Sequence, residues 1–213
     1  MFNLSYKNWR RESENFDDAY SKKSQVPIFK DYVKKDLNLR LEIVFEIIGS
    51  LKGKTVLDLG CGVGRYSHLI AEAGGNAIGI DISETAIQKA KIKAEEFGTT
   101  DRCKFICDDF LKMKNFPKAD IVIAMGFVQY FENEVDVVKK IVNSSDKFIF
   151  DLSRFYHWIN PMRKVYRTLL KGIKFRSHTN SEVNVLLSKA SSSPEFKYKI
   201  NKNNPTIYII HNL

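Results

Sequence analysis

The stretch VLDLGCGVGRYSHLI, residues 56–70, constrains the fold more than any other part of the sequence. An apolar run with strand character leads into Gly60, Gly62 and Gly64, and a helical pattern follows. Glycine accepts positive φ and has no side chain, so a ligand can approach the backbone of such a turn closely. In an open α/β sheet, the first strand-to-helix turn lies at the edge where ligands bind. The stretch therefore predicts a ligand-binding α/β fold.

Short apolar strands alternate with amphipathic helices along most of the chain. Strands are predicted at residues 54–60, 76–82, 103–109, 119–126, 147–153, 195–200 and 206–212. Helices are predicted at residues 36–51, 65–74, 83–98, 133–144 and 181–190. Because right-handed crossovers lay helices on both faces of a parallel sheet, the pattern predicts a Rossmann-like three-layer sandwich. We expect a mostly parallel sheet of seven strands, with an antiparallel hairpin at its C-terminal edge.

Charge and cysteine usage narrow the functional class. The net charge is +9, and residues 154–202 hold eleven Lys or Arg against two Glu, so this segment is expected to favour anionic partners. A solvated lysine-rich face is an equal alternative. Cys61, Cys103 and Cys107 form neither an even disulfide set nor a zinc-binding pair, so no metal is expected. Without an apolar run of about 18 residues or a signal-like start, a cytoplasmic protein with no membrane span is expected.

The spacing of the glycines separates two cofactor classes. A dinucleotide fingerprint reads G-x-G-x-x-G, whereas here the third glycine comes one place early and Arg65 occupies its usual position. Asp58, two residues before Gly60, would repel a pyrophosphate but would attract a cationic group. The turn therefore favours a ligand that carries positive charge.

Residues 54–131 resemble class I S-adenosylmethionine-dependent methyltransferases, and residues 56–91 are similar to the first two motifs of that family. The resemblance implies S-adenosylmethionine as cofactor, with Asp81 on the ribose hydroxyls and Asp109 and Phe110 at the adenine. Asp108 is a competing candidate for the adenine contact. The cofactor-binding residues implied in this way are Asp58, Gly60, Cys61, Gly62, Asp81, Ile82, Asp109, Phe110, Ala124, Met125 and, as a lid residue, Tyr20.

The acceptor is expected beyond the fourth and fifth strands. Gln129, Tyr130 and His157 are the candidate catalytic residues, since the phenol and the imidazole could take or relay a hydroxyl proton. The chain is also distantly similar to magnesium-protoporphyrin O-methyltransferases. It departs from them because Gln129 and Tyr130 stand where those enzymes tend to have a His-containing pair. A small-molecule acceptor methylated on oxygen, with anionic character, is the leading interpretation.

A single methyltransferase domain is expected over residues 1–213. Within it we expect an N-terminal helical lid (1–50), a cofactor-binding core (51–153), a substrate-covering insert (154–180), and a C-terminal helix with edge strands (181–213). An RNA methyltransferase that uses the basic segment, and a non-catalytic cofactor-binding protein, are alternatives. The oligomeric state is open.

Overall fold

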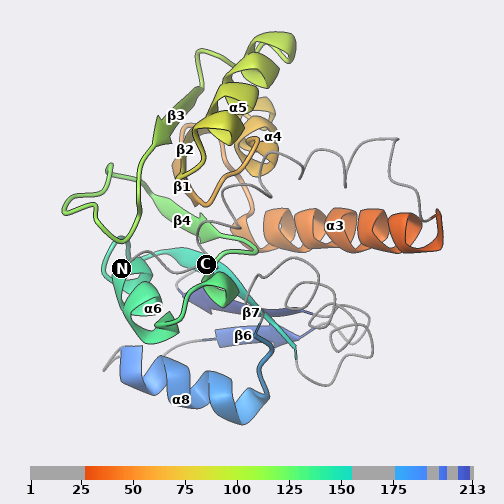
Figure 1. Cartoon of the computed structure of the whole chain (residues 1–213). Helices are drawn as coiled ribbons and strands as arrows, with labels where there is room; N and C mark the ends of the chain where they lie inside the picture. Colours follow the sequence, from red (N-terminus) through yellow and green to blue (C-terminus); the bar gives the residue numbers. More distant parts are fainter. Residues whose placement is uncertain (1–26, 155–175, 191–196, 201–205, 212–213) are drawn as a thin grey trace.

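The computed structural model describes residues 27–154, 176–190, 197–200 and 206–211. These residues form an α/β fold around one sheet of seven strands, in the order β3-β2-β1-β4-β5-β7-β6. Figure 1 shows β3 near one end of the molecule and the β6–β7 pair towards the other. The predicted fold class is confirmed.

Five parallel strands make up the larger part of the sheet. They are β1 (Thr55–Leu59), β2 (Asn76–Asp81), β3 (Cys103–Cys107), β4 (Ile121–Ala124) and β5 (Phe148–Ser153). β6 (Lys197–Ile200) pairs antiparallel with β7 (Thr206–His211), and β7 pairs antiparallel with β5. β4 lies against β1 on the side opposite β2, so the strand order reverses at β1. The carboxyl ends of β1 and β4 therefore border the crevice where ligands bind in such folds.

Apart from the first, the described helices begin and end close to the predicted positions. They are α3 (Pro27–Ile48), α4 (Arg65–Glu72), α5 (Glu84–Glu96), α6 (Glu134–Val142) and α8 (Asn180–Ala190), with a short 3-10 helix, η1 (Val128–Tyr130). Ser83 caps α5 by accepting the backbone N–H of Ala86. The first described helix, α3, begins nine residues before the predicted start: Phe29 and Val33 continue the four-residue spacing of Leu37 and Leu41, and the prediction missed this extension.

Two apolar layers pack against the two faces of the sheet. α3 and α4 contribute Ile43, Val44 and Ile70 to the layer that also contains Val56 of β1. α6 and α8 cover the other face, where Leu57 and Leu59 of β1 lie. Adjacent residues of one strand thus enter different layers, as the two-residue period of a strand requires. The continuous apolar strands of the sequence reflect this burial on both faces.

Within the described part of the chain, no helix is long and apolar enough to cross a membrane. Cys61 is buried, Cys103 is half-buried and Cys107 is exposed, and all three are free thiols. Cys103 and Cys107 lie on β3, as predicted.

Candidate active site

The glycine turn is fixed to the neighbouring strand by backbone hydrogen bonds. The N–H groups of Gly60 and Cys61 both donate to the carbonyl of Ile80 in β2, at 2.8 and 3.1 Å. Gly60 and Gly62 have φ angles of 70° and 54°, a region that residues with a side chain rarely adopt. A Cβ at Gly60 would overlap the Phe127 ring, whereas a Cβ at Gly62 would meet nothing within 4 Å. Gly60 therefore serves packing, and Gly62 leaves open space beside the backbone.

Asp81 joins this turn to the end of β2. One carboxylate oxygen accepts the N–H of Gly62 and the other accepts the N–H of Ser83, each at 2.9 Å. The residue is only 7% exposed, and this burial raises the pKa of its carboxyl group, against the lowering effect of the two backbone hydrogen bonds. The carboxylate is thus held in one orientation at the carboxyl edge of the sheet, with lone pairs left over for further donors.

Asp58 is almost completely buried. Its side chain is 2% exposed and accepts a 2.7 Å hydrogen bond from the hydroxyl of Ser67 in α4. Burial raises its pKa from the ordinary 3.8 to about 7; the Ser67 hydrogen bond opposes this rise, and the nearby Asp81 adds to it. Direct contact between Asp58 and a cationic ligand stays a prediction. The structure shows the carboxylate turned towards the helix.

The loop after β3 is held by its own carboxylates. Asp108 accepts the N–H of Asp109 at 2.7 Å, and Asp109 accepts the N–H of Leu111 at 2.9 Å. Lys140 of α6 donates to the carbonyls of Phe110 and Leu111, at 2.6 and 2.7 Å. This loop begins where the backbone N–H of Asp108 donates to the carbonyl of Asp81. The predicted adenine contacts are therefore brought next to the predicted ribose contact.

A buried ion pair supports the end of β4. Arg40 of α3 donates to one carboxylate oxygen of Asp151 at 3.0 Å, and the N–H of Gly126 donates to the other. Arg40 and Asp151 are 6% and 1% exposed. Ala124 is fully buried and Met125 is half-buried at the same strand end. The pair fixes the backbone that follows Ala124 and Met125, where the sequence predicted a cofactor contact.

Two of the candidate catalytic residues lie on η1, directly after this strand end. Gln129 is 3% exposed, and its side-chain oxygen has no hydrogen-bond partner. Tyr130 is half-buried. The other candidates taken from the motifs, His157 and the lid residue Tyr20, lie outside the described residues.

The sequence interpretation missed a buried pair near η1. Nε2 of His178 lies 2.9 Å from a carboxylate oxygen of Glu134, and both residues are 6% exposed. Arg176 approaches the same oxygen at 3.5 Å. The two residues are 44 positions apart and neither belongs to a motif, so no sequence signal could have paired them. Among the described residues, no group of three or more His, Cys, Asp or Glu side chains could hold a metal ion.

A family model described as a methyltransferase domain matches residues 50–204, which is well over half of the chain. The chain belongs to this methyltransferase family. The membership confirms the class predicted from the glycine turn and Asp81.

Two relatives of this methyltransferase chain are both ubiquinone biosynthesis O-methyltransferases. The ubiquinone biosynthesis O-methyltransferase of Bordetella avium (strain 197N) is 34% identical over 101 residues, covering 47% of this chain and 42% of the relative. The one from Actinobacillus pleuropneumoniae serotype 7 (strain AP76) is 29% identical over 143 residues, covering 64% of this chain and 59% of the relative. The chain therefore spans about half the length of the curated relatives that it matches.

Among solved structures, the magnesium protoporphyrin IX methyltransferase from Synechocystis PCC 6803 with bound SAH has a TM-score of 0.70 to this chain. The two chains are 21% identical, and the match covers 97% of this chain and 94% of the Synechocystis chain. At this identity the similarity shows a shared fold over nearly the whole methyltransferase, and it agrees with the distant resemblance seen in the sequence.

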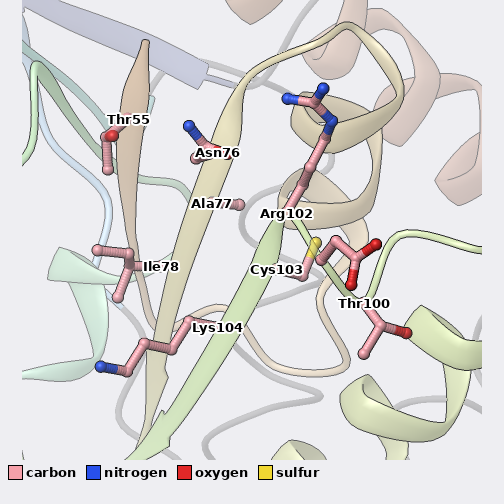
Figure 2. A pocket seen from close by; sticks show the side chains of 9 residues that line it. Thr55, Asn76, Ala77, Ile78, Thr100, Arg102, Cys103 and Lys104 are labelled. Carbon is pink, nitrogen blue, oxygen red and sulfur yellow. The ribbon is translucent and has the colours of Figure 1, made fainter. Parts of the chain in front are cut away.

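A hollow of about 330 Å³ lies at the opposite edge of the sheet from the candidate site. Figure 2 shows side chains from the first residues of β1, β2 and β3 around it. Its lining residues are Thr55, Asn76, Ala77, Ile78, Thr100, Asp101, Arg102, Cys103 and Lys104. Because α/β folds bind their cofactors beyond the carboxyl ends of the strands, this amino-end hollow does not belong to the methyltransferase cleft.

Proposed function

We propose that this chain binds S-adenosylmethionine and transfers its methyl group to an oxygen of a small molecule. The observation that carries the proposal is the anchored carboxylate of Asp81. The backbone N–H groups of Gly62 and Ser83 each donate a hydrogen bond to one of its oxygens, at 2.9 Å. A carboxylate fixed in this way can accept hydrogen bonds from two neighbouring hydroxyls, as a ribose diol requires.

The residues present fit this cofactor. Gly62 leaves space where a side chain would stand, so an extended ligand can lie against its backbone. The loop at Asp109 and Phe110 is tied down next to Asp81 and would hold the adenine. The buried carboxyl group of Asp58 contributes negative charge under the turn when it is ionised. The cofactor supplies an electrophilic methyl group on a sulfonium; the chain supplies orientation and a water-poor site.

An oxygen acceptor with an aromatic body suits the rim beyond β4. The Phe127 ring contacts Phe110 and Phe131, with centroids 5.4 and 4.8 Å apart in edge-to-face arrangements. Phe127, Tyr130 and Phe131 are only half-buried, so this aromatic row reaches the surface beside Gln129. The two relatives are O-methyltransferases, which supports an oxygen as the methylated atom. Arg154 and Arg176 beside β5 favour an anionic acceptor.

The cofactor assignment can be tested by calorimetry with S-adenosylhomocysteine. The wild-type chain is expected to bind it, and Asp81→Asn should weaken binding roughly 10- to 100-fold, since hydrogen bonds to a charged group contribute about 1.5–3 kcal/mol. Asp101→Asn, at the opposite edge of the sheet, is the matched control and should bind like the wild type. Equal affinity in all three proteins would refute the ribose assignment.

Methyl transfer can be followed by mass spectrometry with S-adenosylmethionine and a panel of hydroxylated aromatic acids, 3,4-dihydroxybenzoate among them. A product heavier by one methylene, and resistant to the conditions that cleave methyl esters, would place the methyl group on a hydroxyl. Transfer to bulk tRNA with none to the panel would favour the RNA alternative over the small-molecule proposal.

A further inference from the structure

Three unsatisfied polar atoms lie around the end of β4 and β5. Among the described residues, the buried side-chain atoms without a hydrogen-bond partner include Oε1 of Gln129, Oε1 of Glu134 and Nδ1 of His178. A buried polar atom without a partner is costly, so such atoms are rare in native proteins. Three of them in one region indicate a place where a ligand completes the hydrogen bonding.

The fold places these residues on the acceptor side of the candidate site. Gln129 lies on η1, which packs against both β5 and α6. Glu134 is the first residue of α6, and the N–H of His178 donates to the carbonyl of Ser153, the last residue of β5, at 2.7 Å. All three therefore stand at the carboxyl edge of the sheet, where the aromatic row ends.

The pairing of His178 fixes which ring nitrogen is available. Its Nε2 lies 2.9 Å from Oε2 of Glu134, and a carboxylate can only accept a hydrogen bond, so the imidazole donates from Nε2. In a neutral ring the lone pair then resides on Nδ1, the atom that lacks a partner. Gln129 and Glu134 likewise present oxygens, which are acceptors. The region is complementary to a ligand that donates hydrogen bonds, such as a hydroxyl group.

We propose that His178, oriented by Glu134, is the general base that takes the proton of the acceptor hydroxyl. This inference rests on the proposed function. In the step, the hydroxyl oxygen forms a bond to the methyl carbon while the carbon–sulfur bond breaks and its electron pair stays on sulfur. The hydroxyl proton passes to Nδ1 of His178, and the imidazolium so formed is stabilised by Glu134. Glu134 acts as a positioning residue.

The charged groups that face His178 come from several segments. Glu134 of α6 is in contact, Arg176 shares the same carboxylate, and Arg154 lies beside His178 across an isolated β-bridge. Glu182, in the first turn of α8, interacts electrostatically with His178.

The test combines a spectroscopic measurement with kinetics. In ¹⁵N-histidine NMR of the wild-type chain, neutral His178 should show the Nε2–H tautomer, and Glu134→Gln should alter the equilibrium between tautomers. With 3,4-dihydroxybenzoate, or with another hydroxyl acceptor from the same panel, His178→Gln should lower kcat about 100-fold or more. It should also abolish the acidic limb of the kcat–pH profile.

His211→Gln is the matched control, since His211 pairs with Phe148 at the beginning of β5, the other edge of the sheet. It should keep the wild-type kcat and pH profile. An Nδ1–H tautomer of His178 in the wild type, or an unchanged kcat profile in His178→Gln, would overturn the proposal. His178→Gln should bind S-adenosylhomocysteine within about twofold of the wild type. Failure of the wild type itself to bind this ligand would refute the proposed function, while the NMR tautomer would still show whether Glu134 orients the His178 ring.

Discussion

The raised pKa of Asp58 makes a specific prediction about the pH dependence of stability. In the unfolded chain this carboxyl group has its ordinary pKa of 3.8, whereas in the folded chain burial raises the pKa to about 7. Between these values the folded state binds one more proton than the unfolded state, so stability falls as pH rises. Below the lower value, and above the higher one, the group contributes no slope.

Asp58→Asn removes the titratable carboxyl group, so the variant lacks its contribution to the pH dependence of stability. From the two pKa values, the free energy of unfolding of the wild type is expected to fall by roughly 3 kcal/mol between about pH 4.5 and pH 8 because of this group. The variant does not share this loss. The stability of the variant relative to the wild type should therefore rise by about that amount over this interval. The constant cost of burying an amide beside Ser67 cancels, because only the difference between two pH values is used.

The assay is urea unfolding of both proteins at several pH values, with Asp101→Asn as the exposed control. Asp81 also has a raised pKa and is present in every variant, so its own titration is common to all of them apart from its coupling to Asp58. Parallel stability curves for wild type and Asp58→Asn would refute the reasoning, because they would mean that Asp58 is ionised in the folded state throughout the interval.

The glycine turn and the buried ion pair give further predictions. Gly60→Ala should destabilise the fold by about 2–3 kcal/mol, since the new Cβ overlaps the Phe127 ring at a positive φ. The Cβ of Gly62→Ala would meet open space, so this variant should lose only about 1–2 kcal/mol of stability, measured by thermal unfolding. It should nevertheless bind S-adenosylhomocysteine more weakly than this loss of stability explains. Arg40→Met should cost about 3–5 kcal/mol in urea, because Asp151 is left buried with an uncompensated charge. Adding Asp151→Asn should recover part of that loss, and additive losses in the double variant would contradict this account.

The local part of the candidate site was accessible from the sequence. The turn from Gly60 to Gly64 and the position of Asp81 follow from fixed spacings along one strand–turn–helix unit and the strand after it. The structure brings these residues together through the hydrogen bond between Gly62 and Asp81. For Asp58, the sequence predicted a ligand contact, which stays a prediction. What it could not give is the partner of the carboxylate, Ser67 of α4, which the structure shows.

The sequence by itself determined the fold class, the order of strands and helices along the chain, and the methyltransferase family, because periodicity and motif spacing are local properties. Tertiary structure alone decided which distant residues meet. Arg40 and Asp151 are 111 positions apart, and Glu134 and His178 are 44 apart. They pair because β4 and β5 extend the sheet on the far side of β1, which brings α3, η1, α6 and the residues before α8 to this part of the sheet. Such contacts depend on how crossovers place whole elements, and no local pattern encodes them.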